Sequence, residues 1–221
     1  MTSPAPGTPQ SRPPRAPAGA PGAPGAPSVE LREMRWWDID PVLVLERALF
    51  PDDAWSRGMF WSELAHARGP GATRHYVVAE ADGRLVGYAG LAVVGDLADV
   101  QTIAVAREHW GTGLGARLLT DLVRYATEVG CTEVMLEVRV DNARARRLYE
   151  RFGFEPVGVR PGYYQPGPVD ALVMRLPLDG PGAAAPSPPG TETAPTRAPG
   201  APNTPAPETP APERQGSDTH G

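Results

Sequence analysis

Lysine is absent from this chain of 221 residues, and every basic side chain is arginine. A P-loop places a lysine on the phosphates of its nucleotide at a fixed spacing, so this class of site is excluded. The formal net charge of −5 argues against a protein that attracts nucleic acid by electrostatics. We therefore expect no direct nucleic-acid partner.

Cysteine is almost absent as well, since Cys131 is the single one. One cysteine builds neither a disulfide framework nor a cysteine-based metal site, and a lone free cysteine is most often a buried thiol. His66, His75 and His109 are not spaced like metal ligands. We expect surface or loop histidines and no bound metal.

Long apolar runs are missing too. No stretch approaches the length that spans a membrane, and no apolar core of a signal peptide lies near the N-terminus. The prediction is a soluble, cytoplasmic protein without a membrane partner.

Proline is plentiful but unevenly placed, with nine of the 28 prolines in residues 1–28 and eleven in residues 179–221. These two segments are rich in Pro, Ala, Gly and Thr and have almost no large apolar side chains. They cannot bury enough surface to offset the entropy of ordering, so we predict disordered tails. Residues 29–178 remain, which suits one domain with its own core.

The pattern in this central part alternates between strand and helix. Strands are predicted at 29–34, 74–81, 84–94, 97–106, 131–140, 154–164 and 169–178, and helices at 38–50, 57–67, 116–129 and 143–153. Asp38 and Ser56 are the expected caps of the first two helices, and Asp141 or Asn142 caps the last. The Asp82-Gly83 pair predicts a hairpin turn. The fold class is α/β in a single domain.

A glycine-rich stretch between a strand and a helix organises this pattern. Gly111, Gly113 and Gly115 alternate, and the helix that follows keeps one apolar face, formed by Leu118, Leu119, Leu122, Val123, Ala126 and Val129. A glycine loop that opens a helix presents bare backbone N–H groups at the positive end of the helix dipole, which favours a phosphorylated ligand.

Two classes of ligand remain open for this loop. Gly111-x-Gly113-x-x-Ala116 has the spacing of a dinucleotide or S-adenosylmethionine site, with Asp141 as the acidic residue after the next strand. Four residues separate these glycines from their strand, however, and too few residues follow Asp141 to complete a doubly wound sheet. An acyl-coenzyme A site is the better prediction.

Three stretches carry a resemblance to the GNAT acetyltransferase superfamily, over residues 29–178. They are the loop Trp110–Gly115, the strand MLEVRVDN at 135–142 and RRLYERFGFEPVGVR at 146–160. Within the superfamily the chain looks most like the RimI group, which acetylates the N-terminal alanine of a small-subunit ribosomal protein. The further motifs are Phe50-Pro51 with Trp55-Ser56, and Arg160 with Tyr163-Tyr164 and Asp170-Ala171.

The resemblance implies a central, mostly antiparallel mixed sheet flanked by about four helices, with acetyl-coenzyme A as acetyl donor. It implies that the backbone of Ile103, Ala104 and Val105 pairs with the pantetheine arm. The residues implied to hold the pyrophosphate or other parts of the cofactor are Gly111, Thr112, Gly113, Leu114, Gly115, Ala116 and Asn142. It also implies a ribosomal protein N-terminus as partner, and we expect a monomer or weak dimer.

The resemblance assigns the chemistry to two residues. Glu137 is the implied general base, and its place in an apolar strand already indicates a function or a partner, because a buried carboxylate is costly. The alternative is a structural ion pair with Arg139 or Arg160. Tyr149 is the implied general acid for the leaving thiolate, and the alternative is an aromatic at the edge of the core. Tyr163 and Tyr164 line the substrate groove or pack at an edge.

Other residues have simpler interpretations. Trp36, Trp37 and Trp61 suggest packing in the core or at a domain edge. Arg144, Arg146, Arg147 and Arg151 suggest a solvated helix face, or else contacts to the 3′-phosphate of coenzyme A or to ribosomal RNA.

The chain departs from the family pattern twice. Trp110 and Gly111 replace the usual Gln/Arg pair of the loop, and FPDDAWS is longer than the usual FPWS. Acetylation of another protein's N-terminus or of a small amine is therefore an alternative. A non-enzymatic acyl-coenzyme A adaptor whose proline-rich tails dock on aromatic grooves is a further one.

Overall fold

The computed structural model describes residues 28–164, 167–178 and 196–197. The strands are β1 (Val29–Glu33), β2 (Arg74–Ala81), β3 (Arg84–Val94), β4 (Leu97–Val105), β5 (Glu133–Arg139), β6 (Glu155–Tyr164), β7 (Val169–Pro177) and β8 (Thr196–Arg197). The α-helices are α1 (Ile39–Leu49), α2 (Arg57–Ala65), α3 (Leu114–Glu128) and α4 (Ala143–Arg151), with 3-10 turns η1 (Trp36–Asp38) and η2 (Arg107–His109). The predicted disordered tails lie outside the described residues, except for Ser28 and β8.

The sheet confirms the predicted mixed, mostly antiparallel arrangement. Its order is β1-β2-β3-β4-β5-β7-β6, with β8 added to β4. Only β4 and β5 run parallel among these described pairs, because α3 connects them as a crossover. Asp82 and Gly83, with φ of 50° and 73°, form the predicted hairpin turn between β2 and β3.

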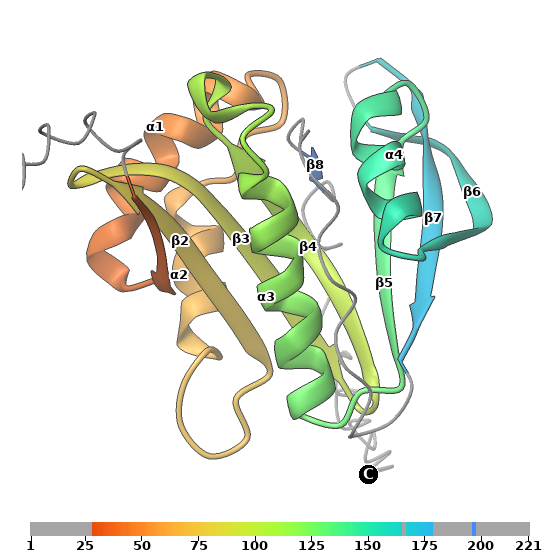
Figure 1. Cartoon of the computed structure of the whole chain (residues 1–221), viewed down its shortest axis with the longest axis horizontal. Helices are drawn as coiled ribbons and strands as arrows, with labels where there is room; N and C mark the ends of the chain where they lie inside the picture. The colour runs from red at the N-terminus through yellow and green to blue at the C-terminus, as the bar shows by residue number, and fades with distance from the viewer. Residues whose placement is uncertain (1–27, 165–166, 179–195, 198–221) are drawn as a thin grey trace, which may run out of the picture.

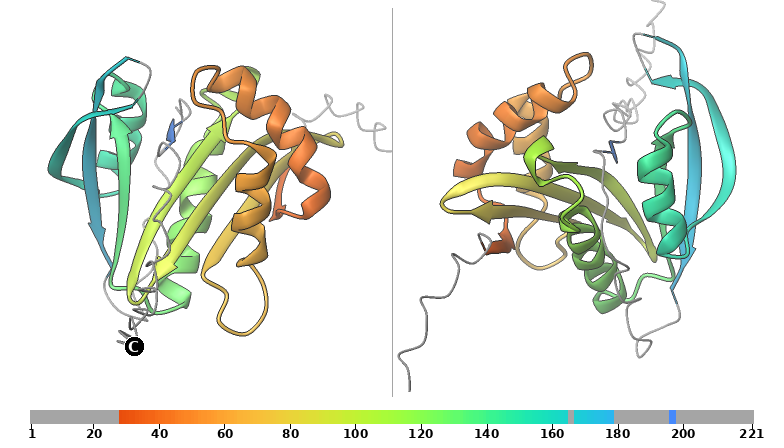
Figure 2. Two further views of the ribbon diagram at one scale, coloured as in Figure 1. Left: turned by 180° about the vertical axis from the view of Figure 1, so that it is seen from behind. Right: turned by 45° about the horizontal axis from the view of Figure 1, so that its top comes forward.

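Two helical layers cover the two faces of the sheet. The helices α1 and α2 lie on one face, and α3 and α4 lie on the other (Figures 1 and 2). Alternation along β2 explains both cores: Val77 and Ala79 join the cluster under α3, whereas Tyr76 and Val78 join the cluster under α1 and α2. No helix of the described part is long and apolar enough to cross a membrane.

Helix capping agrees with the sequence in two of three cases. The Ser56 hydroxyl accepts a hydrogen bond from the Met59 N–H at 3.3 Å and caps α2. Asn142, rather than Asp141, caps α4 by accepting from the Ala145 N–H at 3.0 Å. The prediction for Asp38 is wrong, because its carboxylate makes no cap for α1.

Asp38 is instead a buried anchor between β1 and α1. Its carboxylate accepts from Arg32 at 2.7 and 2.9 Å and from the Arg35 N–H at 2.8 Å. These charge-assisted bonds, above all those from Arg32, lower the pKa of Asp38 although burial opposes them. A tertiary ion pair has therefore taken the side chain that local sequence assigned to the helix.

Other expectations fail at the surface. Val129 follows the last residue of α3 and is 48 % exposed, so it is not part of the buried face. For Trp36, Trp37 and Trp61 the core placement is wrong and only the placement at an edge is left: all three are exposed and pack on one another, with Trp36 6.2 Å from Trp61 and 5.4 Å from Trp37 between ring centroids. Helical spacing alone does not show which aromatic face is covered.

His75 is not a simple surface histidine either. Its ring is half-buried, stacks on Tyr125 with centroids 4.1 Å apart, and lies 2.8 Å from the Asp121 carboxylate. Cys131, as predicted, is a buried free thiol.

Candidate active site

The parallel pair β4 and β5 separates part of the way along the sheet. Leu97–Val100 pair with Glu133–Leu136, and no pairing between the two strands continues past Val100. At this point β4 carries a bulge, since Gly90 pairs with Thr102 and Leu91 with Val100, leaving Gln101 as an extra residue. A bulge bends its strand. The β5-facing edge of β4 is therefore open along Thr102–Val105, apart from the short contact with β8 (Figure 1).

The predicted cofactor strand lies on this open edge. The side chains of Ile103, Ala104 and Val105 are buried in the two cores, so only their backbone is available to a ligand. That agrees with the backbone pairing which the resemblance implies for the pantetheine arm. The Val105 carbonyl already accepts from the Trp110 indole N–H at 2.8 Å.

The glycine loop turns directly into α3. Gly111 and Gly113 have φ of 79° and 84°, a conformation that glycine adopts without strain. A Cβ added at either one would meet no atom within 4 Å, so the surface beside the loop is clear. Gly113 is the N-cap and has no side chain to cap the helix. Residues of this kind fit a phosphate group at the positive end of a helix.

The other loop residues predicted to bind cofactor are placed differently. Thr112 is exposed, and its hydroxyl donates to the His109 carbonyl at 2.8 Å. Leu114 and Ala116 are buried in the core under α3, so their side chains serve packing. Gly115 lies in the first turn of α3. For these helical positions the structure leaves only backbone contacts to a cofactor.

Two cations lie against the ring of Trp110, in the loop where Trp110 and Gly111 replace the Gln/Arg pair of the family pattern. The guanidinium of Arg107 lies 5.3 Å from the centroid of the indole, and that of Arg144 lies 5.0 Å away. Arg144 therefore belongs to the loop side of α4, whereas Arg147 and Arg151 are exposed on the solvated face that was predicted. Sequence reasoning missed this placement because the two arginines are far apart along the chain.

Glu137 is buried on β5, directly after the last residue that pairs with β4. Its side chain is 8 % exposed, and its Oε1 lies 3.0 Å from Nη1 of Arg160, which is 54 % exposed. Burial raises the pKa of Glu137, and the charge of Arg160 opposes that shift. The ion pair with Arg160 is therefore present, and the raised pKa of Glu137 is compatible with a general base, which stays a prediction.

Asp99 is a site residue that sequence reasoning missed. Burial, followed by the negative charge of Glu137, raises the pKa of Asp99 to about 6. Gln101 donates to its carboxylate at 2.6 Å. The signal was available, because Asp99 interrupts an apolar strand as Glu137 does. The pairing of β4 with β5 explains how the two acids come together: Asp99 lies opposite Met135, so it shares a sheet face with Glu137, two residues further along β5.

The three candidate tyrosines have different surroundings, and two of them, Tyr163 and Tyr164, lie near Glu137. Tyr149 is 1 % exposed and packs edge-on against Phe154, with centroids 5.7 Å apart. Tyr164 is buried and donates from its hydroxyl to the Glu137 carbonyl at 3.3 Å. Tyr163 is half-buried, and the guanidinium of Arg160 lies 5.4 Å from the centroid of its ring. The pKa values of Tyr163 and Tyr164 are both raised, and burial is the largest cause in each case.

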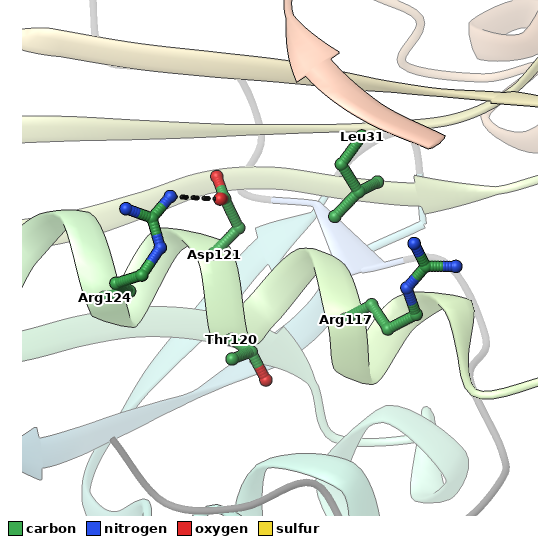
Figure 3. Close-up of a pocket in the computed structure, with 5 residues that line it drawn as sticks. All are labelled: Leu31, Arg117, Thr120, Asp121 and Arg124. Atoms are coloured by element: carbon green, nitrogen blue, oxygen red, sulfur yellow. Dashed lines mark hydrogen bonds and ion pairs between the residues drawn. The ribbon is translucent and has the colours of Figure 1, made fainter. Parts of the chain in front are cut away.

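A hollow on the other side of α3 is separate from these residues. It has a volume of about 260 Å³ and is lined by Leu31 of β1 and by four residues of α3, namely Arg117, Thr120, Asp121 and Arg124 (Figure 3). Arg124 and Asp121 form an ion pair along the α3 side of it, 2.5 Å between nitrogen and oxygen. None of the residues predicted to bind or react lines this hollow. Among the described residues no group of His, Cys, Asp and Glu is arranged to hold a metal.

Comparison with known proteins agrees with this geometry. The model of the acetyltransferase (GNAT) family matches residues 32–154. The chain belongs to the GNAT acetyltransferase family. The acetyltransferases of this family use acetyl-coenzyme A. The match covers the open edge of β4, the glycine loop and Tyr149.

Individual relatives narrow the comparison. The chain is 41 % identical over 136 residues to the N-alpha-acetyltransferase RimI of Mycobacterium tuberculosis, covering 59 % of this chain and 81 % of that protein. It is 35 % identical over 120 residues to the ribosomal protein bS18-alanine N-acetyltransferase of Escherichia coli, covering 53 % and 81 %. The crystal structure of the E. coli ribosomal-protein-S18-alanine N-acetyltransferase superposes with a TM-score of 0.62 at 28 % identity, covering 71 % of this chain and 99 % of that one. The protein is thus a RimI-like GNAT acetyltransferase.

Proposed function

We propose that this protein transfers the acetyl group of acetyl-coenzyme A to the N-terminal alanine of a small-subunit ribosomal protein. The substrate named for its E. coli relative supports the proposal, and the M. tuberculosis relative is named as an N-alpha-acetyltransferase. The single observation in this chain that carries it is Glu137, a buried carboxylate with a raised pKa beside the open edge of β4. We propose the cytoplasm as the place of the reaction, because a ribosomal protein is the proposed substrate.

Different residues around the gap between β4 and β5 would hold different parts of acetyl-coenzyme A. The open backbone of β4 at Ile103 and the N–H groups at the start of α3 would hold the pantetheine arm and the pyrophosphate. Arg107 and Arg144, gathered by Trp110, bring positive charge beside the loop. Acetyl-coenzyme A supplies the activated thioester when bound.

Glu137 then acts on the incoming amine. An N-terminal amine has a pKa of about 8, so its deprotonation at pH 7 costs about 1.4 kcal/mol, whereas a lysine side chain costs about 4.6 kcal/mol. A carboxylate of modestly raised pKa is adequate for the first task. Tyr149 is the group proposed to return a proton to the leaving thiolate. The transfer is direct, in a ternary complex.

Release of coenzyme A from acetyl-coenzyme A and a hexapeptide that begins with alanine tests the proposal. We expect steady release with the free peptide and none with the same peptide blocked at its N-terminus. The variant Glu137→Gln should lower kcat about 10²-fold or more. This loss should be greatest at pH values where Glu137 is ionised while most of the amine is protonated, and it should shrink below the acid limb, where wild type also loses its base. Release that ignores the block, or full activity of Glu137→Gln, would contradict the assignment.

A further inference from the structure

The open edge of β4 pairs with a segment from the far end of the chain. The backbone of β8 runs antiparallel to β4, with Arg197 opposite Thr102 and Thr196 opposite Ile103. In Figure 1, β8 lies between β4 and β5, in the gap that opens after Val100. In the described part of the chain β8 pairs with β4 alone.

This pairing uses the groups that the proposed function assigns to the acetyl donor. Along one edge of a strand, a backbone N–H or C=O bonds to one neighbour at a time. The pantetheine arm and β8 would both pair at Ile103. The pantetheine arm and β8 therefore cannot occupy this edge of β4 at the same time.

We propose that the gap between β4 and β5 is also a binding site for the chain's own C-terminal segment, which adds there as a short strand and competes with acetyl-coenzyme A. The inference rests on the proposed function, because the competitor it names is the acetyl donor of that reaction. The recognition mode is β-strand addition to an open sheet edge.

The tether makes this competition effective but limited. Leu178 is fixed to the domain, since its N–H donates to the Thr132 carbonyl at 2.8 Å, and residues 179–195 connect it to β8. Covalent attachment to the domain gives β8 a local concentration in the millimolar range at its own site, which compensates for the weakness of a two-residue pairing. The expected inhibition is about two- to fivefold in the apparent KM for acetyl-coenzyme A, rather than a complete block.

Two truncations separate β8 from the rest of the segment. Deletion of residues 179–221 removes β8, whereas deletion of residues 200–221 keeps it; both keep Leu178. We expect the first to lower the KM for acetyl-coenzyme A about two- to fivefold with kcat unchanged. The second should behave like the full chain. Equal KM values for all three proteins would overturn the proposal.

Limited trypsin digestion of the full chain gives a readout without catalysis. Arg197 and Arg214 are the two arginines of residues 179–221, and neither precedes a proline. Added coenzyme A should speed cleavage after Arg197 by displacing β8 from β4, and should leave cleavage after Arg214 unchanged. Cleavage after Arg197 that is indifferent to coenzyme A would contradict the competition.

Calorimetry with acetyl-coenzyme A tells the two proposals apart. If neither the full chain nor the protein lacking residues 179–221 binds it, the proposed function fails, and the competition fails with it. If both bind it with the same affinity, the function stands and the competition is wrong. Tighter binding by the truncated protein supports both.

Discussion

Arg160 of β6 reaches across β7 to Glu137 of β5, with Nη1 and Oε1 3.0 Å apart. The acid is buried while its counter-charge is half in solvent, so water screens the cation more than the carboxylate. The pKa of Glu137 is accordingly raised by burial, and the ion pair only moderates the shift. A base of this kind is held in place by its neighbours without losing its basicity.

Removal of Arg160 should therefore change the pH profile. In Arg160→Ala the moderating charge is gone, the pKa of Glu137 rises further, and the acid limb of the kcat/KM profile moves to higher pH. A half-exposed pair contributes about 0.2–1 kcal/mol, which corresponds to at most about 0.7 pH unit. Arg175→Ala is the matched control, because Arg175 of β7 pairs with another acid of β5, Glu133, at 3.6 Å. An acid limb that stays in place in Arg160→Ala would show that the pair does not govern the base.

Asp99 should act on Glu137 in the opposite direction. The two negative charges repel, so Asp99→Asn lowers the pKa of Glu137 and moves the acid limb to lower pH. Stability gives a second readout. The folded pKa of Asp99, about 6, lies above its ordinary 3.8, so wild-type stability is lost as pH rises from about 4 to about 6.

Asp99→Asn does not lose stability in this way, because asparagine does not ionise. Its free energy of unfolding should exceed that of wild type by about 1–2 kcal/mol at pH 7, and the difference should vanish near pH 4. Urea denaturation at the two pH values measures it. A difference of the same size at both pH values would mean that the substitution acts through packing rather than through charge.

Much of this architecture, and the functional interest of a charged residue within one β-strand, could be predicted from the sequence. The hairpin at Asp82-Gly83 and the cap at Ser56 were predictable because each depends on neighbours within a few residues. Glu137 was identifiable because a charge in an apolar strand is costly wherever it lies. These are local or compositional signals.

The remainder depends on contacts between distant parts of the chain. Asp38 was assigned to a helix cap, but Arg32 reaches it through the tertiary structure. The meeting of Arg107 and Arg144 at Trp110 depends on how α4 packs beside the loop. The position of Asp99 beside Glu137 depends on the pairing of β4 with β5, which sets Asp99 opposite Met135. In each case the decisive partner is far away in sequence.

Tyr149 should matter for turnover rather than for folding. Tyr149→Phe keeps the ring that packs against Phe154 and removes only the hydroxyl. We expect kcat to fall about 10²-fold or more with little change in the KM for acetyl-coenzyme A. Steady-state kinetics at saturating peptide checks this, with thermal unfolding as the control for an intact core. A raised KM with unchanged kcat would assign the hydroxyl to binding.

Cys131 should be dispensable. Its thiol is buried in the core under α3, and burial raises its pKa, so it is a poor nucleophile. Direct transfer predicts that Cys131→Ala turns over at close to the wild-type rate, with some loss of thermal stability. Mass spectrometry after incubation with acetyl-coenzyme A alone should find no acetyl group on the wild-type protein. A covalent adduct at Cys131 would replace the ternary-complex mechanism by an acyl-enzyme.

Trp110 should determine how well the loop holds the donor. Its indole N–H ties it to the Val105 carbonyl, and its ring gathers Arg107 and Arg144. Trp110→Ala loses both functions and should raise the KM for acetyl-coenzyme A about tenfold, since each cation–π contact and the hydrogen bond contribute about 0.5–1 kcal/mol. Trp110→Phe keeps a ring for the cations but no N–H donor, so its KM should lie between the two.

The exposed Trp61 offers the control for this series, because Trp61→Ala removes an indole of α2 that lies away from the loop. Its KM for acetyl-coenzyme A should match wild type. Dephospho-coenzyme A, which lacks the 3′-phosphate, then locates the effect: if the arginines face that phosphate, Trp110→Ala and wild type should bind this analogue equally well. If the tenfold difference persists with the analogue, the arginines serve the pyrophosphate. Identical KM values in Trp110→Ala and Trp61→Ala would show that the glycine backbone alone holds the donor.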